Sequence, residues 1–255
     1  MKTIKDITAA FKAATKSEEW MEQFKVDERV AVQKAIAQFE KRMEKIRLVQ
    51  QSHDEKLAFD SSFLQQPTHF VAGVDEAGRG PLAGPVVTAA VILPNNCQQL
   101  LGVNDSKQLS KEMRNNYASR IKEHALSYSI HFQPVEAIDC LNILEATRQS
   151  MTASVESLEI EPHVVIADAM VLPVKMEQHS IIKGDAKSLC IAAASILAKT
   201  ARDEYMENLA KQFPQYGFEQ HAGYGTKQHL QAIETYGVTH EHRTTFEPIK
   251  SIVKG

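Results

Sequence analysis

The chain has 255 residues, a formal net charge of −3 and 43% hydrophobic residues, enough for a large domain alone or with an extension. The slightly acidic balance gives no global sign of nucleic-acid binding, so such a partner would have to meet a local basic surface. No run approaches the roughly 18 apolar residues of a membrane span, and the N-terminus lacks the apolar stretch of a secretory signal. The three cysteines are widely separated and lack metal or redox spacing, which predicts free thiols in a cytoplasmic protein.

Residues 1–66 are predicted to form a helical N-terminal extension. Apolar residues recur at spacings of three and four over residues 4–14 and 32–46, so these stretches predict two helices that can pack as a hairpin. Basic and acidic residues nearly balance here, which favours a stabilising or partner-contacting extension over a dedicated nucleic-acid module. The Gln-Gln-Pro at residues 65–67 predicts a junction, and we expect a second domain over residues 67–255.

Two short apolar runs, residues 69–72 and 86–93, are bounded by Gly or Pro and predict adjacent strands of a buried sheet. Asp75 and Glu76 follow the first run. Because consecutive side chains on a strand point to opposite faces, only one of this pair can face a given site squarely. A solvated turn is the alternative interpretation of such a pair.

A Gly-Arg-Gly sequence, Gly78 to Gly80, follows these acids directly. Glycines let the backbone turn sharply and let a ligand come close to it. Arg79, a bulky cation between the two glycines, suits a phosphate-bearing partner. This neighbourhood favours a functional site at the preceding acids over an ordinary turn.

The middle of the chain alternates predicted helices and strands. Ser110 fits the N-cap of a helix that runs to about residue 124. Residues 127–132 alternate like a strand, and residues 136–158 predict one long helix that ends before a proline. Residues 189–198 are apolar nearly all round, so this later helix should be buried.

Two further apolar runs stop at carboxylates, one at Asp168 and one at Asp185. Together with Asp75 and Glu76, the predicted strand ends deliver four acids to one edge of a sheet. Clustered carboxylates repel one another and burial makes this worse, so such a cluster is tolerable mainly when cations fill it. All-oxygen ligands suit Mg²⁺ or Mn²⁺ rather than zinc. Scattered capping and turn acids are the alternative.

The C-terminal part holds a glycine-rich loop, residues 220–226, before a short predicted helix over residues 227–236. Tyr224, between two glycines, is exposed on both faces and suits stacking on a base or sugar. A structural turn with an anchoring aromatic is the alternative. Four histidines in this part come without cysteines and on different elements, which disfavours a metal site: His221, His229, His240 and His242.

Several of these motifs resemble one known family. Asp-Glu-Ala-Gly-Arg-Gly followed by Pro-Leu-Ala-Gly-Pro, residues 75–85, closely resembles the signature of type 2 ribonucleases H, and of bacterial ribonuclease HII in particular. The sister family, ribonuclease HIII, lacks the Gly-Arg-Gly. Further similar text, spread from about residue 70 to about residue 249, includes Asp-Ser-Lys at 105–107, Ala-Asp-Ala at 167–169, Gly-Asp-Ala-Lys-Ser at 184–188 and Gly-Tyr-Gly-Thr at 223–226.

The resemblance implies an α/β fold: a ribonuclease H-like mixed central sheet flanked by helices, with an N-terminal helical extension and a C-terminal helical segment. It implies an endoribonuclease that hydrolyses the RNA strand of RNA–DNA hybrids and incises at single ribonucleotides embedded in duplex DNA. The implied chemistry uses a two-metal site with Mg²⁺ or Mn²⁺ and leaves a 3′-hydroxyl and a 5′-phosphate. A monomer is expected from the family, whereas the role of the extension and any replication-factor partner stay open.

The same resemblance implies roles for particular residues. Asp75, Glu76, Asp168 and Asp185 would be the catalytic metal ligands. The Gly-Arg-Gly backbone would hydrogen-bond the 2′-hydroxyl, the group that separates RNA from DNA. Tyr224 would pack on the deoxyribose that follows the ribonucleotide. The implied substrate contacts are Gly78, Arg79, Gly80, Lys107, Lys187, Ser188 and Tyr224.

Two other functions compete with this one. The first is another divalent-metal nuclease of the same fold, such as a ribonuclease HIII-like or Holliday-junction-resolving enzyme, and the intact Gly-Arg-Gly and Gly-Tyr-Gly-Thr argue against it. The second is a non-catalytic nucleic-acid-binding module. The four retained acids disfavour it, because a binder of polyphosphate gains nothing from concentrated negative charge.

Overall fold

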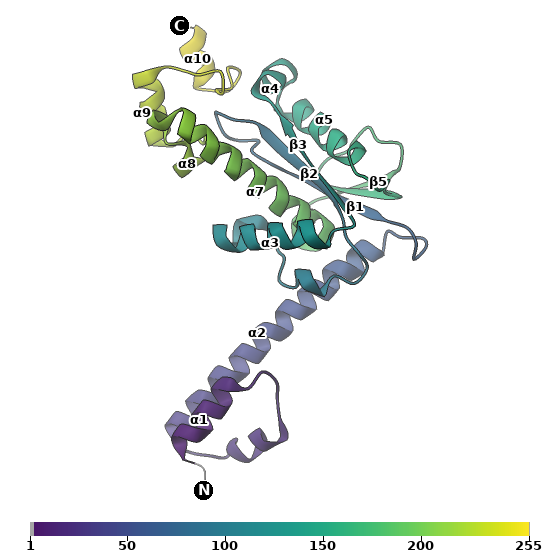
Figure 1. Ribbon diagram of the computed structural model, residues 1–255, viewed down its shortest axis with the longest axis vertical. Helices are drawn as coiled ribbons and strands as arrows, with labels where there is room; N and C mark the ends of the chain where they lie inside the picture. Colours follow the sequence, from purple (N-terminus) through teal and green to yellow (C-terminus); the bar gives the residue numbers. More distant parts are fainter. Residues whose placement is uncertain (1–2, 255) are drawn as a thin grey trace. The chain divides into compact units, whose positions relative to one another are not determined.

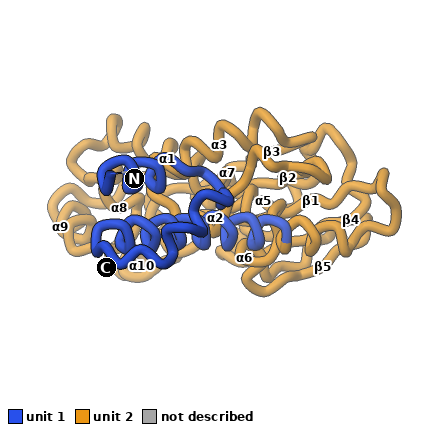
Figure 2. Tube along the Cα trace, turned by 90° about the horizontal axis from the view of Figure 1, so that it is seen from below, with its two compact units in different colours: residues 1–54 blue, residues 55–255 orange. Residues whose placement is uncertain are grey.

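The computed structural model describes residues 3–254, apart from the side chain of Gln108. The chain divides into two compact units, residues 1–54 and residues 55–255, which Figure 2 distinguishes by colour. The division falls within one helix, α2 (Val30–Ser61), and lies earlier in the chain than the junction predicted at residue 67. None of the described helices is long and apolar enough to cross a membrane. All three cysteines are free thiols, as predicted.

The first unit is a small helical assembly. It contains α1 (Ile4–Ala13), a 3-10 helix, η1 (Glu19–Phe24), and most of α2. Thr3 caps α1 through a reciprocal capping box with Asp6, which satisfies backbone N–H groups that the first turn leaves free. The predicted apolar stripes of α1 and α2 meet in one buried cluster: Ile7, Phe11, Met21, Val32, Ile36 and Phe39.

The second unit is built on a mixed five-stranded sheet with the order β3-β2-β1-β4-β5. The predicted adjacent strands, β1 and β2, pair antiparallel, as do β2 and β3, whereas β4 and β5 are parallel to β1. The fold class predicted from the sequence, a mixed sheet flanked by helices, is therefore confirmed. The strands are β1 (Val71–Ala77), β2 (Val86–Ile92), β3 (Ser127–Gln133), β4 (Val164–Asp168) and β5 (Glu177–Ile181).

Helices cover both faces of this sheet (Figure 1). The helix α7 (Leu189–Gln212) packs on β1 and β2, and α3 (Lys111–His124) packs on α7. The first half of α7 is buried all round, as the sequence predicts. Gly73 allows this close packing, because a Cβ at that position would lie 2.3 Å from backbone atoms of Cys190 and Ile191. The core of the second unit therefore lies between β1 and α7.

The opposite face shows one departure from prediction. The single helix expected over residues 136–158 is two helices, α4 (Val135–Leu141) and α5 (Ile143–Glu156), and α5 packs on β1, β2 and β3. The break is Asn142, which has a φ of 76° and whose side chain accepts hydrogen bonds from the backbone N–H groups of Leu144 and Glu145. Asparagine tolerates positive φ and caps helices, so it can stop one helix and start the next.

The C-terminal segment is helical, as predicted, and adds a cluster beside the second half of α7 (Figure 1). It is joined to α7 by a 3-10 turn, η4 (Pro214–Tyr216). Apolar side chains of α7, of this segment and of Leu82 form one buried group, so the segment is anchored next to the loop between β1 and β2. Its helices are α8 (Phe218–His221), α9 (Lys227–Tyr236) and α10 (Ile249–Lys254).

Candidate active site

Two of the predicted acids come from neighbouring parallel strands. Asp75 lies on β1, and Asp168 is the last residue of β4. The register pairs Val74 with Ala167, so the next residue on each strand brings these two carboxylates to the same edge of the sheet. Asp75 is 5% exposed, which means that its carboxylate faces the interior between the sheet and α7. This part of the predicted acid cluster is present.

The position of Asp185 differs from the predicted strand end. The strand β5 stops at Ile181, and the chain turns through Lys183, which has a left-handed φ of 55°, into the short helix α6 (Gly184–Lys187). Asp185 therefore lies in the first turn of a helix. A hydrogen bond connects this turn to Asp168, because the backbone N–H of Gly184 donates to Asp168 Oδ1 at 2.7 Å.

Burial and mutual repulsion set the acidity of these groups. Burial, then the charges of Glu76 and Asp168, raise the pKa of Asp75 well above its ordinary value, against a hydrogen bond from Ser195. The pKa of Glu76 is raised chiefly by burial, although the Arg79 guanidinium opposes this. The pKa of Asp185 is raised by burial and by the nearby carboxylates of Asp105 and Asp168. Carboxylates in this state gain from a cation placed among them.

Among the described residues, the Glu76 carboxylate has a buried oxygen without a hydrogen-bond donor. Glu76 Oε2 is buried and accepts no hydrogen bond, while Oε1 lies 3.4 Å from Arg79 Nη1. An unpaired buried carboxylate oxygen is costly, and a hard divalent cation that prefers oxygen ligands would satisfy it. Among residues 3–254, no three acid, histidine or cysteine side chains already stand in position to hold a metal ion. Binding would therefore draw the carboxylates together against their repulsion.

We expect a divalent metal to raise the melting temperature more at about pH 8 than at about pH 5. The raised pKa values mean that the folded apo protein holds more protons on these acids than the unfolded chain does. The stability that Asp75 and Glu76 contribute to the folded protein therefore falls as the pH rises above about 4. A bound cation offsets this loss, and it offsets more at pH 8, where more of these carboxylates are ionised. Thermal denaturation with and without Mn²⁺ at both pH values tests this. Equal shifts at the two pH values would contradict it.

A cleft of about 350 Å³ gathers most of the predicted site. It contains three acids, the Gly-Arg-Gly segment, one predicted cation and the predicted aromatic. The predicted site residues that line it are Asp75, Glu76, Asp168, Gly78, Arg79, Gly80, Lys107 and Tyr224. Residues 75–80 and Tyr224, far apart in sequence, thus meet in one concave surface.

The segment that carries Asp185, Lys187 and Ser188 is not part of the cleft wall. Lys187 is exposed on α6. Ser188 is fully buried and its hydroxyl accepts the backbone N–H of Ile191, so it caps α7. In this structure Ser188 therefore acts as the N-cap of α7. A substrate contact for Lys187 or Ser188 stays a prediction.

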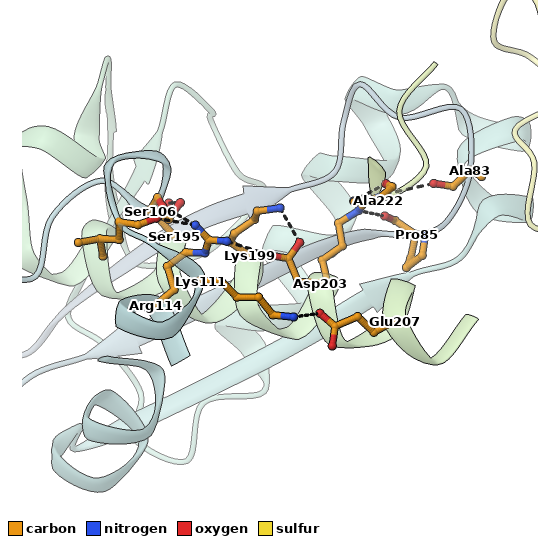
Figure 3. Close-up of polar contacts among 12 residues, drawn as sticks. Ala83, Pro85, Ser106, Lys111, Arg114, Ser195, Lys199, Asp203, Glu207 and Ala222 are labelled. Atoms are coloured by element: carbon orange, nitrogen blue, oxygen red, sulfur yellow. Dashed lines mark hydrogen bonds and ion pairs between the residues drawn. The ribbon is translucent and has the colours of Figure 1, made fainter. Parts of the chain in front are cut away.

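Sequence reasoning missed one face of α7. Ser195, Lys199 and Arg202 follow one another at spacings of four and three and all line the cleft. Lys199 and Arg114 of α3 both bind the Asp203 carboxylate, as Figure 3 shows. The helical spacing of Ser195, within the apolar half of α7, and of the two cations that follow it is the signal that could have indicated this face.

Two buried arginines hold the backbone around the cleft. Arg202 donates to the carbonyls of Ala83, Pro85 and Ala222, and it is 1% exposed. Arg243, fully buried, donates from three nitrogens, and burial lowers its pKa to about 9, so it remains a cation at neutral pH. Its acceptors are the carbonyls of Gly78, Arg79 and Gly84.

The two glycines of the Gly-Arg-Gly segment have different roles. Gly78 has a φ of 97°, and a Cβ there would lie 2.0 Å from Arg202 Nε, so the protein itself requires glycine. Gly80 is exposed, and a Cβ there would meet only the Tyr224 ring, at 3.5 Å. Tyr224 is 48% exposed. Gly80 and Tyr224 therefore present a backbone segment and an aromatic ring side by side to the cleft.

Three of the four C-terminal histidines support the Tyr224 loop through hydrogen bonds. The Thr239 N–H donates to His242 Nδ1, so His242 carries its proton on Nε2 and donates to His229 Nε2 at 3.1 Å. His229 Nδ1 then donates to the Tyr224 carbonyl at 2.9 Å. His221 accepts the Gly223 N–H through Nδ1. Burial lowers the pKa of both His229 and His242 to about 4, so these rings are neutral hydrogen-bonding groups.

A mixed sheet that carries paired acids on its first and fourth strands beside a glycine-rich cleft defines a nuclease of the ribonuclease H class. Two family models match the chain: Ribonuclease HII over residues 72–248 and Ribonuclease HII N-terminal domain over residues 3–64. The chain belongs to the ribonuclease HII family.

Two ribonucleases HII are similar to this protein over nearly the whole chain. A Ribonuclease HII from Halalkalibacterium halodurans is 47% identical over 250 residues, which is 97% of this chain and 95% of the relative. A Ribonuclease HII from Staphylococcus saprophyticus is 45% identical over 253 residues, 98% of each protein. The predicted family and the predicted ribonuclease H hydrolase activity are thereby confirmed.

Solved structures agree on the fold. The crystal structure of ribonuclease H2 from Pyrococcus horikoshii superposes with a TM-score of 0.64 at 29% identity, covering 72% of this chain and 97% of that one. RNase HII in a PCNA complex from Archaeoglobus fulgidus has a TM-score of 0.59 at 25% identity, covering 70% and 95%. A Bst-RNase HIII solved with Mn²⁺ has a TM-score of 0.56 at 20% identity, covering 74% and 71%, and at that identity it supports the fold alone.

Proposed function

We propose that this ribonuclease H cleaves the RNA strand of RNA–DNA hybrids and also incises duplex DNA on the 5′ side of a single embedded ribonucleotide. The observation that carries the proposal is the cleft itself. It joins carboxylates that need a cation to an exposed glycine backbone and a half-exposed tyrosine. A site that only bound polyphosphate would not place unpaired carboxylates at its centre.

The chemistry we propose needs Mg²⁺ or Mn²⁺ in a two-metal site, which would supply an activated water and stabilise the leaving 3′ oxygen. Asp75, Glu76 and Asp168 would hold the cations from the cleft wall, and Asp185 would join from α6. The orphaned oxygen of Glu76 is the group most in need of this partner. The products would carry a 3′-hydroxyl and a 5′-phosphate.

The positively charged side chains near the acids are suited to contact the phosphate groups of a nucleic acid. Arg79, Lys107 and Lys199 line the same cleft as the carboxylates, although the chain as a whole is slightly acidic. These side chains would supply the local positive charge that a nucleic-acid partner requires. We assign phosphate contacts to these three side chains.

Recognition of the ribose would fall to the exposed edge of the cleft. Gly80 has no side chain to keep the substrate away, so its backbone can reach the 2′-hydroxyl in the minor groove. The Tyr224 ring beside it would pack on the following deoxyribose. These two contacts together would read the junction from RNA to DNA.

The test is cleavage of an end-labelled DNA duplex that contains one ribonucleotide, with Mg²⁺, with Mn²⁺ and with EDTA. We expect metal-dependent incision on the 5′ side of the ribonucleotide. Tyr224→Ala should reduce this cleavage by about tenfold, because one stacking contact is worth about 1–3 kcal/mol. Tyr224→Phe, which keeps the ring, is the matched control and should cleave nearly as the wild type does.

The outcomes separate the alternatives. Cleavage of long hybrids alone would keep the nuclease and remove the junction-reading role of Gly80 and Tyr224, as in a ribonuclease HIII-like enzyme. Binding without cleavage under every metal condition would reject the proposed chemistry. An unchanged rate for Tyr224→Ala would reject the stacking contact.

A further inference from the structure

The C-terminal end of α2, residues 55–61, contains a lysine in an unusual environment. Lys56 is 3% exposed, although it belongs to the predicted extension rather than to the predicted catalytic domain. Its Nζ donates to Asn104 Oδ1 at 2.8 Å and to the Val103 carbonyl at 3.3 Å. Burying an ammonium group is costly, and an apolar side chain of similar length would be tolerated better if packing were its only task.

The acceptors of Lys56 lie in a loop that leads into the cleft. Next to Asn104, Asp105 Oδ1 accepts the backbone N–H of Lys107 at 2.9 Å and caps the 3-10 turn η3 (Ser106–Gln108). The Ser106 hydroxyl contacts the Ser195 hydroxyl at 3.0 Å (Figure 3). Lys56 therefore fixes one side of the turn that presents Lys107 to the cleft.

Lys56 also belongs to the electrostatic environment of the acids. Its pKa is lowered by burial, while the carboxylates of Asp185, Asp105 and Asp60 act in the opposite direction. The Asp185 carboxylate is the largest of these three influences. An ammonium group that attracts Asp185 competes with any other cation that approaches it.

A second side chain of the same segment supports the other flank of the site. Asp60 Oδ2 accepts the backbone N–H groups of Leu189 at 3.0 Å and Cys190 at 2.9 Å, where α7 begins directly after α6. Asp60 is 5% exposed. Lys56 and Asp60, one helical turn apart, thus hold the loop at residues 103–104 and the start of α7.

We infer that the end of α2 is a working part of the active site, in which Lys56 is a positioning residue. Lys56 holds the loop at residues 103–107 so that Lys107 faces substrate, and its charge weakens metal binding at the acids. The inference rests on the proposed metal-dependent function. The end of the N-terminal extension would then act directly on both affinities: Lys56 would strengthen substrate binding and weaken metal binding.

The test compares Lys56→Met with the wild type in the full-length chain. We expect the KM for a hybrid substrate to rise about tenfold as Lys107 loses its fixed position. Mn²⁺ should bind about fivefold more tightly by calorimetry without substrate, because a nearby positive charge has been removed. Lys45→Met, which removes an exposed lysine from the same helix, is the matched control and should change neither quantity.

A second variant separates the two effects. Asn104→Leu removes the shorter of the two hydrogen bonds of Lys56 and keeps its charge, so the KM should rise while Mn²⁺ affinity does not increase. Weaker Mn²⁺ binding together with a higher KM in Lys56→Met would indicate general damage and overturn the inference, as would two unchanged values. Failure of the wild type to bind Mn²⁺ or to cleave would instead reject the proposed function, so the two failures are distinguishable.

Discussion

Asp75→Asn is expected to lower turnover on the order of 10³-fold while leaving the fold intact or slightly more stable. The side chain keeps its shape but loses the charge that would hold a cation. Burial, and then the charges of Glu76 and Asp168, raise the pKa of its carboxylate, so removing the charge relieves desolvation and repulsion in the apo protein. Steady-state cleavage and thermal denaturation without metal measure the two effects.

The matched control is Asp54→Asn, which makes the same change at an exposed position on α2. It should leave both turnover and melting temperature close to those of the wild type. A near-normal rate for Asp75→Asn would remove this acid from the metal site. A large fall in its melting temperature would mean that the ionised carboxylate stabilises the fold, contrary to the direction of its pKa.

Arg243→Met is expected to lower the free energy of unfolding by at least about 3 kcal/mol and to abolish most activity. Arg243 is fully buried and donates to the carbonyls of Gly78, Arg79 and Gly84, so the substitution removes the donor from one buried and two partly buried acceptors. The same carbonyls belong to the loop that carries the Gly-Arg-Gly segment. Urea denaturation and cleavage of a hybrid measure the two losses.

Arg243→Lys should not restore either property, because a single ammonium cannot span the acceptors that a planar guanidinium reaches. The control is Arg47→Met, which breaks an exposed ion pair with Glu44 and an exposed hydrogen bond to Gln51 and should cost less than about 1 kcal/mol. A loss below about 1 kcal/mol for Arg243→Met would show that water replaces the guanidinium at these carbonyls.

The strands β1 and β2 and the buried half of α7 could be predicted because each is a local pattern. An apolar run that ends at Asp168 or Asp75 indicates a strand and its acid without reference to the rest of the chain. The resemblance then places these acids in one site, and the structure brings Asp75, Glu76 and Asp168 to one cleft.

Other features could not be predicted because their partners are distant or are backbone atoms. Arg243 acts on carbonyls more than 150 residues earlier, and a carbonyl has no sequence signature. Lys56 lies in what looks like an ordinary polar helix face, and only the fold reveals that its ammonium is buried against the loop before Asp105. Asn142 was hidden inside a helical pattern, since a single asparagine does not by itself end a helix.

The chain of imidazoles behind Tyr224 has a consequence for how the enzyme should respond to acid. Each ring nitrogen of His229 and His242 is already committed to a partner, and neither ring accepts a proton until the pH approaches about 4. These two imidazoles therefore stay neutral across the neutral pH range, although they lie directly behind the tyrosine loop. An acidic limb near neutral pH in the pH–rate profile of this enzyme would therefore not report the protonation of His229 or His242.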